Sequence, residues 1–137
     1  MVKLSELKEG DVVGVLYEGA QREGVVTKVQ RDQRLACVNN GTQEFWYPLE
    51  DIVPLPLTEE RLVNTLGFER KETADGVKFL RGPFRVLIHD PGNYSNIEVW
   101  YREDRRYFNH PLYVHELQNH YLSMTKVPLD AEMAEQQ

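Results

Sequence analysis

The stretch that decides the fold prediction is Pro111-Leu112-Tyr113-Val114-His115-Glu116-Leu117-Gln118-Asn119-His120-Tyr121-Leu122-Ser123-Met124. Apolar residues recur within it at helical spacing and define one face of an α-helix. They are Val114, Leu117, Tyr121 and Met124. Pro111 suits a first helical turn, where its missing N–H costs nothing, and Pro128 lies beyond the expected end. We therefore predict a C-terminal helix that closes a core formed by the strand-rich sequence before it.

The N-terminal part, residues 1–56, reads as short strands separated by turn signals. The predicted strands cover residues 12–17, 24–30, 35–38, 43–47 and 49–53, with a polar loop at 21–23. Five short strands within about 50 residues predict a small, bent antiparallel sheet or barrel. The order of turns over residues 8–53 resembles the opening of SH3-like barrels of the KOW and Tudor kind. Such barrels bind RNA, DNA, peptides, modified side chains or only a neighbouring domain.

The second part, residues 57–128, reads as helix, antiparallel sheet, helix. Pro54 and Pro56 favour an extended connector before it. A short helix is predicted over 58–67, with Thr58 as N-cap and Gly67 as terminator. About four strands then follow between residues 68 and 108, with a broad loop at 90–96, and one face of their sheet should pack both helices. Residues 129–137 lack a persistent apolar face and are predicted to fray.

The sequence thus predicts a β-rich α+β protein, with an SH3-like small barrel followed by an antiparallel sheet with two helices. We expect the two parts to pack together, because neither alone buries much apolar surface.

Composition narrows the class of protein. The chain has 137 residues, 41% of them hydrophobic, and a formal net charge of −6, so a packed core is expected and a nucleic-acid-binding surface is not favoured by net charge. A single cysteine, Cys37, excludes an internal disulfide and suits a reducing compartment. No signal-peptide core and no apolar run of membrane-spanning length is present, so we expect a cytoplasmic protein that does not contact a membrane.

Two motifs carry a family resemblance that covers residues 57–126. They are Leu57-Thr58-Glu59-Glu60 with Leu66-Gly67-Phe68, and Tyr113-Val114-His115-Glu116-Leu117-Gln118-Asn119 with Tyr121. The chain resembles a family of small proteins found in Bacteroidetes genomes, their phages and mobile elements, whose members tend to read LTEEWLLKFGF and later YVHQLQNLYFALTG. It departs from that pattern at Arg61, Glu116 and His120. The resemblance implies a phage or mobile-element origin but no established activity, cofactor or substrate.

Three polar residues of the predicted C-terminal helix are candidates for a binding site. His115, Gln118 and Asn119 lie beside its apolar face, where a partly buried amide must find hydrogen-bond partners. They would either bond backbone groups of a strand end or loop, which is the interpretation we favour, or line a groove for a ligand or peptide. His115-Glu116 with His120 does not make the zinc-protease motif, because a spacing of five residues rotates the second imidazole to another helix side. We predict no metal site and no cofactor.

Trp46 and Trp100 are the other binding candidates, each in a predicted strand rich in aromatic residues. Aromatic residues in strands mostly pack in cores or in cross-strand pairs, but an exposed Trp can anchor a protein interface or stack on bases. No residue set points to catalysis. We therefore expect a non-enzymatic accessory or adaptor protein whose partner is another macromolecule, most simply a protein. The alternatives are a nucleic-acid-binding module that uses the barrel, and a small-ligand binder or enzyme built around His115, Gln118 and Asn119.

Overall fold

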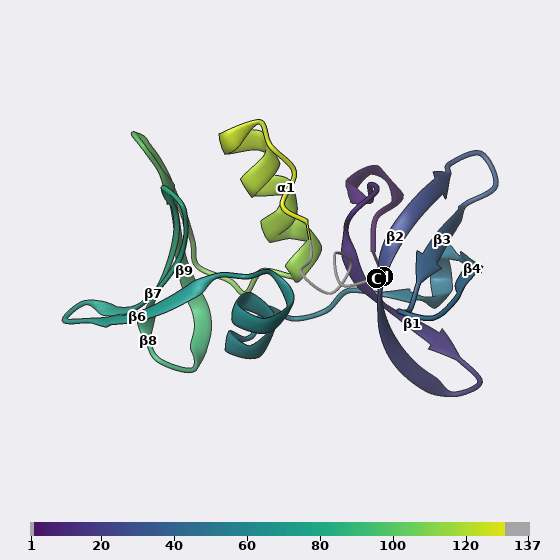
Figure 1. The fold of residues 1–137 in the computed structure, drawn as a ribbon, viewed down its shortest axis with the longest axis horizontal. Coiled ribbons are helices and arrows are strands. Elements are labelled where there is room, and N and C mark those ends of the chain that lie inside the picture. Colours follow the sequence, from purple (N-terminus) through teal and green to yellow (C-terminus); the bar gives the residue numbers. More distant parts are fainter. Residues whose placement is uncertain (1, 131–137) are drawn as a thin grey trace.

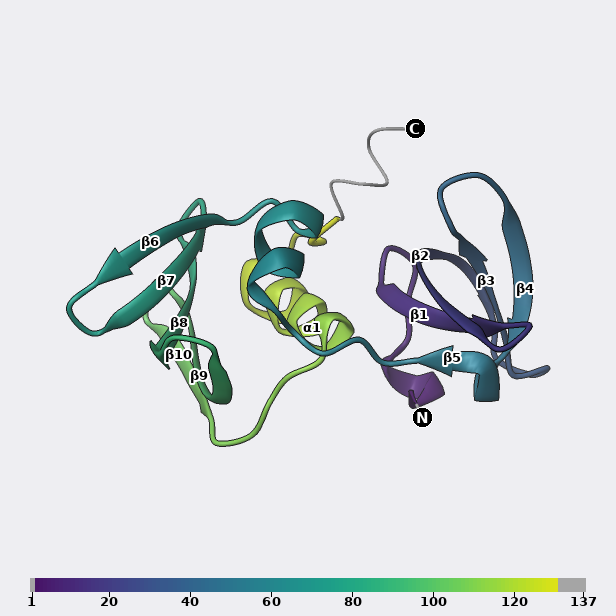
Figure 2. The same cartoon turned by 90° about the horizontal axis from the view of Figure 1, so that it is seen from below.

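The computed structural model describes residues 2–130, which form two antiparallel sheets on either side of one α-helix (Figures 1 and 2). The first sheet comes from the N-terminal part of the chain and the second from the middle, and helix α1 (Val114–Thr125) lies between them. The protein is therefore a β-rich α+β protein, with two five-stranded antiparallel sheets and a C-terminal helix.

The first sheet has the strand order β4-β3-β2-β1-β5, with all neighbours antiparallel. Its strands are β1 (Val12–Tyr17), β2 (Ala20–Gln30), β3 (Leu35–Asn39), β4 (Glu44–Pro48) and β5 (Ile52–Val53). The 3-10 turns η1 (Leu4–Glu6) and η2 (Leu49–Asp51) precede β1 and β5. Strands β4 and β5 are the two edges of this sheet, and no closed barrel is formed by the strands of residues 2–130.

The first hairpin is tighter than the sequence predicts. The polar run 21–23, expected to be a loop, belongs to β2, and Gln21 pairs with Leu16. The reason is the turn: Glu18 and Gly19 both have positive φ, 50° and 79°, which is the backbone geometry of a two-residue hairpin turn. Strand pairing therefore begins again immediately after the turn, at Ala20.

Gly24 permits a close approach of β2 and β3. A Cβ atom at this position would lie 2.6 Å from Val38 Cγ1 and 2.7 Å from the carbonyl oxygen of Asn39. Both distances are far below van der Waals contact. Only a residue without a side chain fits here.

The predicted helix over 58–67 is present as a short helical segment. Its N-terminal cap is confirmed, since the amide of Arg61 donates to Thr58 Oγ1 at 3.2 Å. Within it, η3 (Arg61–Thr65) is π-helical, and the amide of Leu66 reaches back five residues to the Arg61 carbonyl at 2.9 Å. Gly67, with φ +76°, ends the segment as predicted.

The second sheet is a simple meander with the order β10-β9-β8-β7-β6. Its strands are β6 (Glu69–Thr73), β7 (Gly76–Arg81), β8 (Phe84–Asp90), β9 (Asn93–Tyr101) and β10 (Asp104–Phe108). The prediction of a broad loop at 90–96 is wrong. Only Pro91 and Gly92 turn the chain, with Gly92 at φ +84°, and β9 begins at once.

Helix α1 begins three residues later than Pro111, where the sequence places its first turn. The preceding residues are extended instead, because they bond the connector: the Leu57 amide donates to the Leu112 carbonyl at 3.2 Å, and the Val114 amide to the Leu55 carbonyl at 2.9 Å. Glu116 then caps the helix by accepting from the Tyr113 amide at 2.9 Å. At the other end, Lys126 is left-handed, with φ +66°.

Two apolar clusters fill the protein. One lies inside the first sheet and includes Val13, Val38 and Ile52. The other contains the inner face of the second sheet together with α1 and η3, and it also takes in Val12 and Val25 from the first sheet. The predicted division after residue 56 falls in the connector. The second apolar cluster contains residues from both sides of that division.

The predicted fraying of residues 129–137 does not hold at Leu129, which is buried and accepts a hydrogen bond from Gln118. Residues 131–137 lie outside the described part of the chain.

Candidate functional site

The polar side of α1 faces the start of the first sheet, in a contact that we call the helix seat (His115, Gln118 and Asn119 against residues 6–12). Gln118 is its centre and is 1% exposed. Its Oε1 accepts from the Val12 amide at 2.8 Å, and its Nε2 donates to the carbonyls of Gly10 and Leu129 at 2.8 and 2.9 Å. The amide therefore bonds backbone groups of a strand start and a loop, which is the arrangement that we favour from the sequence.

Asn119 and His115 complete the helix seat. Asn119 Nδ2 donates to the Glu6 carbonyl at 3.0 Å. His115 is buried beside it, with Nε2 3.5 Å from a Glu6 carboxylate oxygen, and neither ring nitrogen has a hydrogen-bond partner among the described residues. The helix seat thus holds α1 to the N-terminal segment mainly through hydrogen bonds from side chains of the helix to backbone groups of that segment.

A buried carboxylate lies at the edge of the helix seat. Asp11 is fully buried, pairs with the Lys8 ammonium and accepts from the Lys8 amide at 3.0 Å. Burial raises the pKa of the Asp11 carboxyl above its usual range, and the Lys8 ammonium opposes that shift. Ionised Asp11 is thus held at a free-energy cost.

His120 belongs to another part of α1, as its spacing from His115 predicts. Its Nδ1 lies 3.0 Å from a guanidinium nitrogen of Arg106 on β10, and its ring packs on Phe108. Burial, followed by the Arg106 charge, lowers the pKa of the His120 imidazole. Across residues 2–130, no cluster of three or more His, Cys, Asp or Glu side chains is arranged to hold a metal ion.

A second candidate lies at the open end of the first sheet, where three aromatic rings meet; we call it the aromatic mouth (Tyr17, Phe45 and Tyr47). Tyr17 and Phe45 stack with ring centres 6.4 Å apart and an interplanar angle of 11°. Phe45 and Tyr47 meet edge to face at 6.5 Å. Tyr17 and Phe45 are 47% and 44% exposed, whereas Tyr47 is buried. The three rings therefore form one wall, in which Tyr17 and Phe45 are exposed to solvent and Tyr47 packs in the core.

Alternation along the strands builds the aromatic mouth. Tyr17 follows Val13 and Val15 on the inward side of β1, and Phe45 and Tyr47 pair across from Val38 and Ala36. The mouth is thus the last, uncovered layer of the core inside the first sheet.

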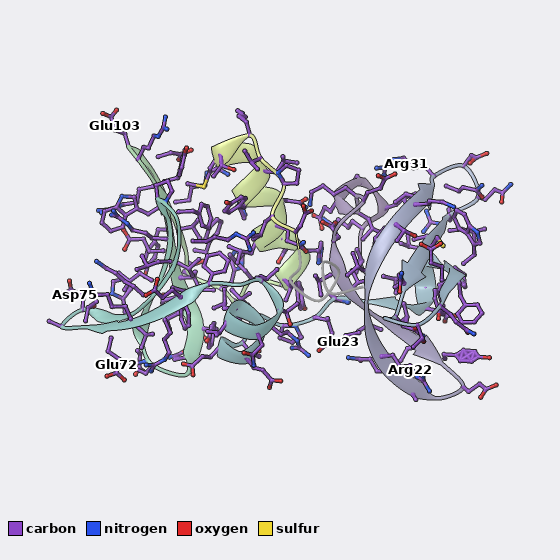
Figure 3. All side chains as sticks on the ribbon, in the orientation of Figure 1. Arg22, Glu23, Arg31, Glu72, Asp75 and Glu103 are labelled. Carbon is purple, nitrogen blue, oxygen red and sulfur yellow. The ribbon has the colours of Figure 1, made fainter. Side chains whose placement is uncertain are left out.

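The mouth lines a hollow of about 280 Å³. Its remaining lining residues are polar or small: Glu18, Ala20, Arg22, Asn40, Thr42 and Gln43. Asn40 shapes one wall, since its Oδ1 accepts from the amides of Thr42 and Gln43. Arg22 and its neighbour Glu23 point to different sides of β2 (Figure 3), so that Arg22 lines the hollow while Glu23 pairs with Arg61 at 2.6 Å. One acidic and one basic residue leave the hollow without net charge.

The two tryptophans lie in different sheets. Trp46, on β4, points away from the mouth and is 43% exposed. Trp100, on β9, is half-buried on the outer face of the second sheet, beneath the guanidinium groups of Arg105 and Arg85. Cys37, paired across from Trp46, is a buried free thiol.

The structure therefore divides the five predicted binding residues among three places. His115, Gln118 and Asn119 come together in the helix seat, whereas Trp46 and Trp100 lie far from it on two sheets. Sequence reasoning missed Tyr17 as a partner of Phe45. The available signal was the alternation of β1, which continues the inward side of Val13 and Val15 to Tyr17.

No protein-family model, curated protein or solved structure matches this chain. Within the described residues, no helix is both long and apolar enough to span a bilayer.

Proposed function

We propose that this chain is a non-enzymatic accessory or adaptor protein that binds another protein, and that the aromatic mouth receives an extended peptide segment of that partner. The observation that carries the proposal is the exposed stacked pair Tyr17–Phe45 beside a hollow. Exposed aromatic side chains in a patch mark interaction sites, and Tyr and Trp supply much of the binding energy at interfaces.

The form of the first sheet supports a peptide as ligand. We infer an SH3-like arrangement, since four strands follow one another as a meander, a 3-10 turn comes next, and the short β5 returns to pair with β1. Aromatic-lined grooves of small β domains bind extended peptides, whose backbone groups need polar partners at the rim. Asn40, Thr42 and Gln43 are placed to supply them.

The charge of the hollow favours a peptide over a nucleic acid at this site. Glu18 and Arg22 cancel, whereas binding to a phosphate backbone relies on an excess of Lys and Arg. A small-ligand site in the helix seat has less support, because the Gln118 amide already makes three hydrogen bonds to the backbone. The resemblance of residues 57–126 to proteins of phages and mobile elements suggests the setting in which such an adaptor would work.

A displayed library of random peptides tests the proposal. The wild-type protein should enrich peptides that bind Tyr17→Ala and Phe45→Ala variants roughly 30-fold more weakly, the loss typical of a central aromatic contact. Trp46→Ala is the matched control, because it removes an equally exposed aromatic residue from the other face of the same sheet. Unchanged thermal melting would show that the variants fold. Peptides that bind the Tyr17 and Phe45 variants as well as wild type, or no enrichment at all, would refute the proposal.

A further inference from the structure

The outer face of the second sheet carries a cluster of basic and aromatic side chains, which we call the Trp100 face (Lys78, Arg85, Trp100, Arg105 and Tyr107). Strand register places these residues together. Arg85 and Arg105 pair across from Trp100 on its two neighbouring strands, and Tyr107 pairs across from Glu98, two residues before Trp100 on β9. Directly opposite side chains of an antiparallel pair share a face. Lys78 joins them because Leu87 pairs with both Lys78 and Glu98. All five residues therefore point away from the apolar cluster that the inner-face residues Val86 and Val99 share with α1.

No other element of residues 2–130 covers this face. In Figures 1 and 2, α1 and the first sheet lie on one side of strands β6 to β10, and the other side is open. Figure 3 shows side chains projecting from the open side, with Asp75 and Glu103 at the tips of two hairpins. A five-stranded sheet with one solvated face is thus available to a large ligand.

Trp100 holds cations above its ring. The guanidinium carbons of Arg105 and Arg85 lie 3.9 and 4.9 Å from the ring centre, and Lys78 Nζ lies 5.6 Å from it. A guanidinium held against an indole ring by a cation–π contact keeps N–H groups at its edge that can donate hydrogen bonds. One of those of Arg105, at Nε, already contacts Glu98 Oε1. Such pre-organised N–H groups match the oxygens of a phosphate.

The face has a positive balance within an acidic protein. Its outward positions on β6 to β10 hold four basic residues, Lys71, Lys78, Arg85 and Arg105, and two acidic residues, Glu69 and Glu98. The turn between β6 and β7 adds Asp75, which lines the same hollow as Lys78 and Trp100, so the basic residues exceed the acidic ones by one. Glu98 pairs with Arg105 at 2.8 Å and lies 3.4 Å from His89 Nε2, so the charges of Glu98 and Arg105 offset each other. The whole chain has a net charge of −6, so this positive balance is local.

An exposed ring adjoins the cations. Tyr107 is 61% exposed, the highest value among the large apolar side chains of the described residues, and its hydroxyl donates to Asn96 Oδ1 at 3.0 Å. That hydrogen bond restrains the ring on the sheet. Cations that track a backbone, beside aromatic rings and guanidinium planes on which bases stack, are the two requirements for sequence-tolerant binding of single strands.

We propose that the Trp100 face binds single-stranded nucleic acid. Phosphates contact Arg85, Arg105 and Lys78, and a base stacks on Tyr107. The carboxylates of an acidic peptide could pair with the same cations, but such a peptide would not need the exposed ring of Tyr107 beside them. This site lies on a different sheet from the aromatic mouth, so each proposal can be refuted without affecting the other.

Labelled oligonucleotides of about twelve residues test the proposal, since single-strand sites span roughly 4–16 nucleotides. Oligo-uridine, oligo-thymidine and a duplex of equal length should be titrated at low ionic strength. We expect both single strands to bind and the duplex to bind more weakly. In a Trp46→Phe protein, Trp100 becomes the sole tryptophan, and its fluorescence should change on binding. The difference between the two single strands distinguishes RNA from DNA as the preferred ligand.

Two pairs of variants locate the site. Tyr107→Ala should weaken binding about 5- to 150-fold, as expected for the loss of one stacked base, whereas Trp46→Ala should leave it unchanged. Lys78→Met should reduce the slope of log K against log salt by about one, whereas Lys28→Met, an exposed lysine of the first sheet, should not. Both Tyr107 and Lys78 reach solvent, so these variants should keep the fold.

Three results would overturn the proposal. The first is no binding at low ionic strength. The second is equal loss in the site variants and in their controls. The third is equal affinity for polyglutamate and for the oligonucleotides, which would make the face a general anion-binding surface.

Discussion

Gln118 offers a direct test of how α1 is held to the first sheet. Replacing it by Ala removes the acceptor of the Val12 amide and the donor to the Gly10 and Leu129 carbonyls. An unpaired buried donor costs about 1–3 kcal/mol, and each lost hydrogen bond contributes about 1 kcal/mol. We therefore expect Gln118→Ala to lower the free energy of unfolding by about 2–4 kcal/mol. A domain with about 5–15 kcal/mol of stability would remain folded.

Chemical denaturation measures this loss, and two further variants separate its causes. Gln118→Met keeps the side-chain volume but not the polar atoms, so it should retain most of the loss. Asn119→Ala removes one half-buried hydrogen bond, to the Glu6 carbonyl, and should cost only about 0.5–1.5 kcal/mol. Hydrogen exchange at the Val12 amide should accelerate in both Gln118 variants. A Gln118→Met protein as stable as wild type would show that the amide fills space rather than satisfying the backbone, and our reasoning would be wrong.

Three other predictions concern single residues. Because burial raises the pKa of Asp11, its contribution to stability is full below the unfolded value near 3.8 and is lost as pH rises through the folded pKa. The unfolding free energy of wild type minus that of Asp11→Asn should fall as pH rises from 3.8, and a rising difference would contradict this. The His120 imidazole should titrate below 6.5 by NMR. The contribution of neutral His120 to stability should be present above that pH and decline as the solution is acidified, whereas His120→Gln should lack this decline. An imidazole that titrates above 6.5 would contradict the prediction. Gly24→Ala should destabilise the protein by about 1–3 kcal/mol, as overpacking does, because the new methyl carbon would meet Val38 at 2.6 Å; a wild-type denaturation midpoint would refute this.

Strand alternation and turn residues were sufficient to predict most elements, because these signals are local. Val12–Tyr17 was predicted with its observed bounds, and Thr58 and Gly67 marked both ends of the short helical segment. The errors in the strand bounds occurred where a turn was tighter than its sequence suggests. Gly19 and Gly92 each complete a short turn, so polar residues beside them entered strands instead of loops.

The candidate sites were harder to predict from the sequence than the helices and strands. It identified Gln118 and Trp100 as unusual, since an amide beside an apolar helix face and a Trp in a strand both need partners. It did not identify those partners, because Val12 is 106 positions from Gln118. Tyr17 and Phe45 likewise become a pair only when β1 and β4 curve toward each other around a shared core.

The sequence by itself determined the class of the fold, since period-two and period-3.6 patterns specify strands and helix independently of their neighbours. Only the tertiary structure decided where α1 begins, because the residues before it gain more from pairing with the connector at Leu55 and Leu57 than from another helical turn. It also decided which polar side chains are structural and which are exposed. Because the helix seat is buried, the Gln118 amide must bond backbone groups, whereas Tyr17 and Tyr107 lie on uncovered faces and stay exposed to solvent. That difference depends on which surfaces meet, and contacts between distant segments are not encoded in any local pattern.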